Sequence, residues 1–181
     1  ASVSIDYFTG YLLNTSGNNA FTFYGSNFTL KYKFKGYGDL LREWNSNLRY
    51  ILSINSSGVV SFSFYETGPT QRTITTNSQT LSSDINELEL TRLNGYFSIK
   101  LNGIPYTVTQ TGAPYSGDIY GPTTEGVRLG DTGVITYSID IYTEKSEDLD
   151  KIQLDFDNNV IDKYGNSTWT NNGVTFDQVN S

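Results

Sequence analysis

Hydrophobic and polar residues alternate along most of the chain in short runs, and Gly, Asn, Asp and Ser separate the runs. Residues 28–35 show this most clearly, because four hydrophobic side chains alternate there with one threonine and three lysines. A period of two residues places successive side chains on opposite faces of a β-strand, so the segment predicts a strand with one buried and one wet face. Since helical periodicity is almost absent, we expect an antiparallel all-β protein.

The strongest hairpin signals lie in the middle of the chain. Residues 87–93 and 96–101 flank Asn94-Gly95. Both central positions of such a tight turn need a positive φ, which Asn and Gly tolerate. A second Asn-Gly pair at 102–103 leads into residues 104–108. We therefore expect three consecutive strands in a meander.

Further strands are expected on both sides of this meander. Residues 50–54 and 59–65 alternate around an Asn-Ser-Ser-Gly turn and predict a hairpin. Residues 110–125 are rich in Gly, Pro, Thr and Tyr and predict a long loop. Alternation resumes at residues 127–130 and again at 134–142.

One short helix and a closing tail are expected near the C-terminal end. Residues 143–152 offer Ser146 as an N-cap, followed by acidic residues in the first turn, where the helix dipole favours negative charge. Residues 154–157 and 173–176 alternate again. We expect this tail to pair with the N-terminal strand around residues 4–13 and so to close a sandwich.

The size and composition agree with one sandwich. A chain of 181 residues can bury a sizeable core, and aromatic residues make up 14% of it. We expect a single domain over residues 1–181, with its core in about residues 20–152. Residues 153–181 then supply closing strands or begin a following module.

The charge of the chain excludes several kinds of partner. A net charge of −7 argues against nucleic acid and anionic membranes, because phosphate binding needs clustered Lys and Arg. The longest apolar runs are too short to cross a bilayer, so we expect no membrane insertion. Charged residues make up only 17% of the chain, and a surface rich in Ser, Thr, Asn and Tyr is common outside cells. We expect an extracellular, cell-surface or virion location.

The strand order resembles that of a known fold family. Residues 86–101 with their hairpin turns, followed by residues 127–130 and 137–142, are similar to concanavalin A-like lectin/glucanase domains of the laminin-G or pentraxin-like type. The resemblance implies a jelly roll of two antiparallel sheets with at most one or two short helices. The sequence departs from the family at residues 85–87, Ile-Asn-Glu, where a tryptophan commonly opens the central strand.

Catalytic chemistry is restricted by the residues that are missing. The chain has no His and no Cys, which excludes Ser-His-Asp triads, histidine bases and cysteine nucleophiles. The pairs Glu87/Glu89 and Asp155/Asp157 have the spacing of a carboxylate pair on one strand face, as a retaining glycosidase needs. Hydrophobic residues alternate with both pairs, so we expect these acids on a solvated outer face and the chain not to be an enzyme.

A calcium ion is the one cofactor that the sequence leaves open. Several relatives in the resembled family hold Ca²⁺ on a rim loop. Hard oxygen donors, which calcium prefers, lie close together in the tail at Asp155, Asp157, Asn159 and Asp162. The alternative is an Asn-rich turn without a metal.

Aromatic residues in loops are the candidates for sugar binding, because a pyranose has an apolar face and a polar rim. The connection around residues 36–45 and the long loop each combine tyrosine or tryptophan with amide or carboxylate groups. The predicted ligand-binding residues are Tyr37, Trp44, Asn45, Tyr115, Asp118 and Tyr120. The alternative for Trp44 is a short helix, since Leu40, Leu41 and Leu48 share helical spacing with it.

These observations favour a non-catalytic carbohydrate-binding or adhesion module of a secreted or particle-surface protein, with a glycan or polysaccharide as its partner. One alternative is a structural capsid, fibre or spike domain of a virus or phage, which would assemble into a homo-oligomer or a larger particle. The second alternative is a glycoside hydrolase or polysaccharide lyase.

Overall fold

The computed structural model describes residues 3–14, 27–43, 50–66, 70–117, 119, 127–143, 152–154, 169–171 and 175–180. These residues form strands and turns without a helix, so none of them belongs to a helix that could cross a membrane. The strands in chain order are β1 (Val3–Asn14), β2 (Phe28–Gly36), β3 (Gly38–Glu43), β4 (Tyr50–Ile54), β5 (Val60–Tyr65), β6 (Gln71–Thr76), β7 (Asn86–Leu93), β8 (Tyr96–Leu101), β9 (Ile104–Pro105), β10 (Val108–Gln110), β11 (Val127–Thr143), β12 (Ile152–Leu154), β13 (Trp169–Asn171) and β14 (Thr175–Asn180).

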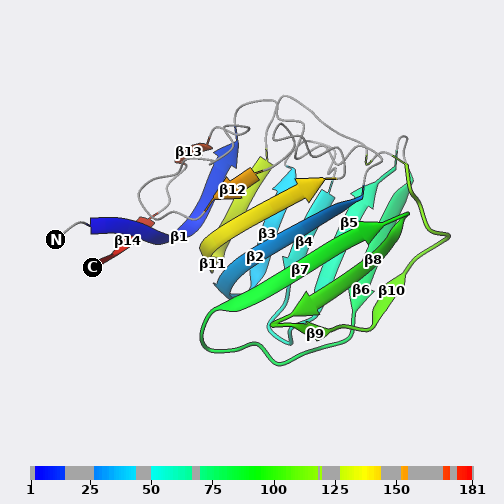
Figure 1. The fold of residues 1–181 in the computed structure, drawn as a ribbon, viewed down its shortest axis with the longest axis horizontal. Helices are drawn as coiled ribbons and strands as arrows, with labels where there is room; N and C mark the ends of the chain where they lie inside the picture. Colours follow the sequence, from blue (N-terminus) through cyan, green and yellow to red (C-terminus); the bar gives the residue numbers. More distant parts are fainter. Residues whose placement is uncertain are drawn as a thin grey trace.

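The strands form two antiparallel layers that β11 joins. Hydrogen bonds connect them in the order β10-β6-β5-β4-β3-β11-β2-β7-β8-β9. The first part of β11 pairs with β3, and the later part pairs with β2. We call β3–β6, β10 and the first part of β11 the β5 sheet, and β2, β7–β9 and the later part of β11 the β7 sheet. The two layers overlap in Figure 1.

The core lies between the two sheets and is rich in aromatic rings. Along β2, β4, β5, β7 and β8, alternate side chains are buried, as the period of two requires. Phe97 of β8 meets two rings of β5, with centroids 5.6 Å from Phe62 and 5.8 Å from Phe64. Burying one such ring stabilises the fold by about 1.5–3 kcal/mol, so these rings hold the sheets face to face.

β11 changes sheet where it passes the connection between β2 and β3. Gly36 has a φ of +83°, and a Cβ at this position would lie 2.3 Å from the carbonyl oxygen of Gly133. The amide of Tyr37 donates a hydrogen bond to that same carbonyl at 3.3 Å. Backbone therefore lies directly on backbone at the crossing, which leaves no room for a side chain.

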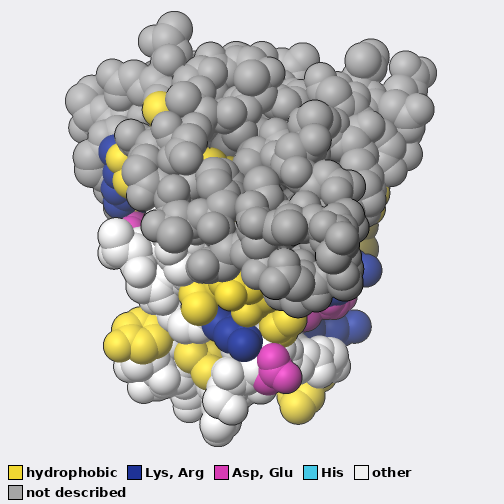
Figure 2. Space-filling view, turned by 90° about the vertical axis from the view of Figure 1, so that its left-hand side faces the viewer, with side chains coloured by type: hydrophobic (Ala, Val, Ile, Leu, Met, Phe, Trp, Pro, Cys, Tyr) yellow, Lys and Arg dark blue, Asp and Glu magenta, His cyan; other side chains and the backbone are white. Residues whose placement is uncertain are grey.

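The last part of the tail pairs with the N-terminal strand, as the sequence predicts, but β12, which ends at Leu154, pairs with β11 and not with β1. β14 pairs with the first part of β1, so that Val3 lies opposite Asn180, and β13 pairs with its end. The two termini consequently lie close together at one side of the molecule (Figure 1). In the described part of the side that Figure 2 shows, hydrophobic, basic and acidic side chains lie next to one another, so no uniformly apolar surface is visible there.

Most of the predicted hairpins are confirmed. β2, β4, β5, β7 and β8 match the alternating runs within one or two residues. Asn94 and Asn102 have φ angles of 51° and 53°, and a glycine with positive φ follows each, as both Asn-Gly turns require. The buried Asn86, which stands near the position of the missing tryptophan, accepts a hydrogen bond from the Ser82 amide at 2.9 Å and so closes the loop before β7.

Several expectations are wrong in detail. Residues 104–108 do not form one strand, because the chain leaves the β7 sheet after β9 and pairs with β6 through β10. Residues 127–130 and 134–142 belong to one continuous strand, β11. β6, which alternation did not reveal, is a strand of mostly polar residues. A helix was expected at residues 143–152. Its first residue, Thr143, belongs to β11 and its last, Ile152, belongs to β12, and residues 144–151 lie outside the described part.

Residues 38–43 are a strand and not a loop or a helix. The pairing of β3 with β4 shifts between Asp39 and Leu41, which is a β-bulge. The bulge allows the consecutive residues Leu40 and Leu41 both to be buried. Two adjacent buried leucines imitate helical spacing in the sequence, and this explains the wrong alternative.

We expect Gly36→Ala to destabilise the fold much more than Gly103→Ala. Both glycines have a φ near +80°, but the space around Gly103 is open within 4 Å. The strained backbone alone costs about 1–2 kcal/mol in each variant, whereas the clash with Gly133 adds about 1–3 kcal/mol at Gly36. Urea unfolding measures both, and equal losses would show that the crossing is not tightly packed.

We expect stability to fall at alkaline pH because buried tyrosines must ionise on unfolding. Burial raises the pKa of Tyr106 from 10.0 to about 12, and its hydroxyl donates to the Gly58 carbonyl at 2.7 Å. A raised folded-state pKa means that this contribution is complete below pH 10 and is lost between pH 10 and about 12.

Tyr106→Phe tests this contribution. The variant is expected to lose about 1 kcal/mol at neutral pH with its hydrogen bond, and then to lose less than the parent protein between pH 10 and about 12. Urea unfolding across that range measures both effects. An identical alkaline decline in the two proteins would contradict the assignment to Tyr106.

Candidate functional site

The outward face of the β5 sheet is covered by small polar side chains. In β4 and β5 the even-numbered residues are buried, so the odd-numbered residues face outward. The strand register aligns these outward positions in two rows that cross the sheet. One row contains Asp39, Ser53, Ser61 and Thr75, and the other contains Arg42, Ile51, Ser63 and Thr73.

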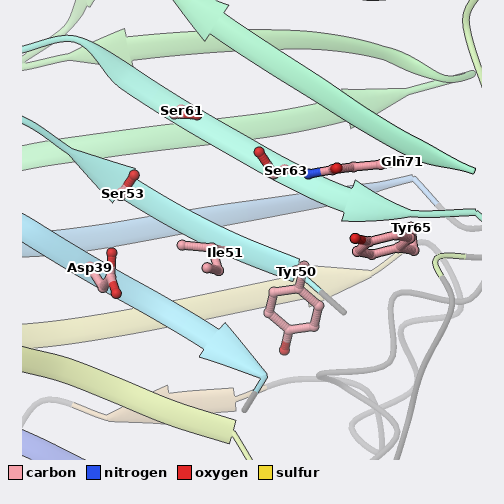
Figure 3. Close-up of a pocket in the computed structure, with 8 residues that line it drawn as sticks. All are labelled: Asp39, Tyr50, Ile51, Ser53, Ser61, Ser63, Tyr65 and Gln71. Carbon is pink, nitrogen blue, oxygen red and sulfur yellow. The ribbon is translucent and has the colours of Figure 1, made fainter. Parts of the chain in front are cut away.

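A groove of about 270 Å³ lies on this face (Figure 3). Its lining comes from four neighbouring strands and consists of Asp39, Tyr50, Ile51, Ser53, Ser61, Ser63, Tyr65 and Gln71. The side chain of Gln71 extends toward Ser63 in Figure 3. The volume is just below the about 300–1,000 Å³ of pockets for drug-sized ligands, so the groove suits one small polar unit of a larger ligand.

A carboxylate and a guanidinium group mark the β3 end of the groove. The bulge in β3 leaves Asp39 and Arg42 on the outward face, opposite Ser53 and Ile51. The Arg42 Nη1 donates to the Asp39 Oδ2 at 3.1 Å. The two side chains keep 21% and 29% of their surface exposed, so a ligand can reach both.

A second arginine stands beside Arg42 on the neighbouring strand. Arg128 lies opposite Arg42 in the pairing of β11 with β3, and it faces outward because Val127 and Leu129 on either side are buried. Its guanidinium carbon lies 4.4 Å from the centre of the Tyr11 ring. Stacking at this distance is a cation–π contact, which fixes the plane of the guanidinium group.

Tyr50 contributes to the groove from below. Its side chain is buried, and burial together with the neighbouring Glu43 carboxylate raises its pKa well above 10.0. The phenol is therefore neutral at physiological pH. Together with the serine hydroxyls and the Gln71 amide, the groove offers neutral donors and acceptors beside one carboxylate, which suits a ligand rich in hydroxyl groups.

Glu87 and Glu89 lie on the outward face of the other sheet, as the sequence predicts. Leu88 and Leu90 between and after them are buried. Lys33 approaches Glu87 at 3.9 Å, and Glu89 lies between Lys31 and Lys100 of the neighbouring strands. The two acids therefore belong to a surface of alternating charges, which explains their i, i+2 spacing without a catalytic role.

Two of the predicted ligand residues lie within the described part, and both lie outside the lining of the groove. Tyr37 is 54% exposed in the connection between β2 and β3. Tyr115 is half-buried and stacks on Phe64, with ring centroids 6.5 Å apart. Its packing against the core leaves only part of the ring for a ligand, and its role in binding stays a prediction.

The other predicted site residues lie outside the described part of the chain. These are Trp44, Asn45, Asp118 and Tyr120 for the ligand, and Asp155, Asp157, Asn159 and Asp162 for calcium. Within the ranges that the structure describes, no three acidic side chains gather where they could hold a metal ion.

Asp39 lies in the connection around residues 36–45 that the sequence singled out, whereas the serines and Tyr65 of the groove were not predicted. The predicted ligand residues were expected in loops, whereas the groove lies on strands. The alternation of Ser and Phe in residues 61–64 was the available signal, because it places small hydroxyls on the whole outward face of β5.

The start of the expected long loop is held firmly against the sandwich. Arg92 of β7 is buried, and its Nη2 donates to the carbonyls of Tyr115 at 2.6 Å and Gly117 at 2.7 Å. Its guanidinium carbon also lies 5.8–6.0 Å from the rings of Tyr115, Phe64 and Phe97. These contacts offset part of the cost of burying a charge and fix residues 115–117.

Comparison with known proteins identifies the fold. No family model matches the chain, and no curated protein matches it in sequence. The native heptameric SAP-like pentraxin from Limulus polyphemus superposes with a TM-score of 0.55 at 11% identity, over 96% of this chain and 93% of the pentraxin. This chain therefore has the concanavalin A-like sandwich fold.

Two further solved structures resemble parts of the chain. The CBM40 of the Ruminococcus gnavus IT-sialidase, bound to α2,3-sialyllactose, has a TM-score of 0.47 at 17% identity and covers 77% of this chain and 87% of its own. Sheep galectin-11 in complex with glycerol has a TM-score of 0.45 at 10% identity and covers 74% and 98%. Of these three structures, only the pentraxin superposes with a TM-score above 0.5.

We expect Arg92→Met to loosen the segment around Tyr115 and Gly117. Removing the guanidinium group leaves two carbonyls without these donors, so amide hydrogen exchange in residues 111–117 should accelerate at least tenfold, or by about 1.4 kcal/mol. Lys100→Met, on the exposed face of β8, is the matched control and should leave this exchange unchanged. Unchanged protection in Arg92→Met would show that other contacts hold the segment.

Proposed function

We propose that the chain is a non-catalytic carbohydrate-binding domain, and that its binding face is the outward face of the β5 sheet. The observation that carries this proposal is the groove between Asp39 and Gln71, which combines a carboxylate, three serine hydroxyls, an amide and two tyrosines. A sugar presents several hydroxyl groups close together, and these can pair with such a set of donors and acceptors.

The groove can contact both the polar rim and the apolar face of a sugar ring. The Ser53, Ser61 and Ser63 hydroxyls and the Asp39 carboxylate are donors and acceptors for the polar rim. Tyr65 and Ile51 supply apolar surface for the flat face of the ring. All of these side chains stand on paired strands, so little conformational entropy is lost when a ligand binds.

A groove of this size implies weak binding at a single site. Contact with one or two sugar units supports affinities that become useful mainly when several copies of a domain act together. We place the domain outside the cell or on a particle surface, where repeated glycans are available. The low share of charged residues and the polar, hydroxyl-rich face support this placement.

Ser63→Leu tests the binding face. The larger side chain fills the middle of the groove, so we expect at least a tenfold loss of affinity for a glycan found on an array, which equals about 1.4 kcal/mol. Ser98→Leu, on the exposed face of β8 in the other sheet, is the matched control and should bind as the parent does.

The same assay separates the groove from the loop residues predicted earlier. Tyr37→Ala and Trp44→Ala should have little effect if the groove binds the ligand. Full binding by Ser63→Leu together with loss in Trp44→Ala would contradict the groove and favour the loops. A chain that binds no saccharide on the array would contradict the proposed function itself.

A further inference from the structure

We infer that the face of the β5 sheet selects glycans that carry a carboxylate, and that Arg42 and Arg128 hold the carboxylate group. This inference rests on the proposed function and names the class of its ligand. Its basis is the arginine pair that stands at the β3 end of the groove, directly beside Asp39.

The two arginines lie in one row of the outward face. Arg128 of β11 lies opposite Arg42 of β3, and Arg42 lies opposite Ile51 of β4, which lines the groove. Side chains that are directly opposite on neighbouring antiparallel strands start from Cβ atoms about 4.5–5.5 Å apart. The two arginine side chains thus start from neighbouring points on the outward face of the sheet.

Both guanidinium groups are held in place by neighbours. Arg128 lies over the Tyr11 ring at 4.4 Å, and Arg42 donates to Asp39 at 3.1 Å. A guanidinium group donates through a planar fork that matches the two oxygens of a carboxylate. Because both forks are oriented before a ligand arrives, a carboxylate placed between them accepts hydrogen bonds without first ordering either side chain.

The arginine pair differs from the other charges of the sandwich. On the β7 sheet, Lys33 approaches Glu87 at 3.9 Å and Lys35 approaches Asp84 at 3.7 Å. On the β5 sheet, Arg42 likewise pairs with Asp39 at 3.1 Å, but a second positive side chain, Arg128, lies directly opposite Arg42, and like charges opposite each other on neighbouring strands repel. A bound anion offsets this repulsion, so the arrangement favours an anionic ligand at this place.

The net negative charge of the chain means that an acidic ligand needs a local positive site in order to bind. The chain carries a net charge of −7, and its field as a whole repels anionic polymers. Preference for an acidic glycan must therefore come from a local site and not from general attraction. On β1, Tyr11 lies opposite Gly130 of β11 and Leu13 lies opposite Arg128. These two side chains add apolar surface beside Arg128 for the sugar ring.

The test uses two pairs of ligands. In the first pair the carboxylate is either free or esterified, and in the second pair the sugar unit that carries the carboxylate is either present or absent. Polygalacturonate is compared with its fully methyl-esterified form, and α2,3-sialyllactose is compared with lactose. We expect at least tenfold tighter binding of the acidic member of one pair, measured by titration calorimetry or biolayer interferometry. The pair that responds distinguishes a uronic acid from a sialic acid as the source of the carboxylate.

Variants then assign the preference to the arginines. Arg128→Gln should reduce the preference for the acidic member at least tenfold, because it weakens binding of the acidic member far more than binding of the neutral member. Arg128→Lys keeps the charge but loses the fork, so it should restore only part of the preference. Lys100→Gln, on the exposed face of the other sheet, is the matched control and should leave the preference intact.

The possible outcomes separate the two proposals. Equal binding of acidic and neutral members by the parent protein overturns the inference and leaves the proposed function intact. An acid preference that persists in both Arg128→Gln and Arg42→Gln also overturns the inference. If neither member of either pair binds, and the array shows no other saccharide, the proposed function fails together with it. The comparison of ligand pairs needs only the parent protein, so it holds even if a variant fails to fold.

Discussion

The sandwich depends on one strand that belongs to both sheets. β11 pairs with β3 at its beginning and with β2 at its end, so its hydrogen bonds continue from one layer into the other, and β1 accompanies it by pairing with both parts. The change of sheet is possible only where backbone can lie on backbone, at the contact between Gly36 and Gly133. Both the core and the outward faces take their positions from this crossing.

The period of two residues serves opposite purposes on the two faces of each strand. Inward side chains of β5 and β8 bring Phe62, Phe64 and Phe97 into one aromatic cluster. Outward side chains of the β7 sheet form alternating charges, whereas those of the β5 sheet are mostly hydroxyls around a groove. A stable core is thus compatible with two outer faces of different chemistry, and the groove of the β5 sheet is the one lined by serine hydroxyls.

The candidate site was the least predictable part. Aromatic residues in loops were the expected ligand residues. The ring of Tyr115, however, packs on Phe64, and its carbonyl accepts a hydrogen bond from the buried Arg92. The groove instead combines Asp39, Ser61 and Gln71 from three strands. No single segment contains this set, so only the order and register of the strands bring it together.

The sequence alone determined the inward and outward alternation and both Asn-Gly turns, because these depend on local residue preferences and on which side chains avoid water. Tertiary structure decided the bulge in β3, the continuity of β11 and the place of Arg128 opposite Arg42. These features depend on the register between distant strands. Register follows from the packing of the whole core, and no short stretch of sequence contains that information.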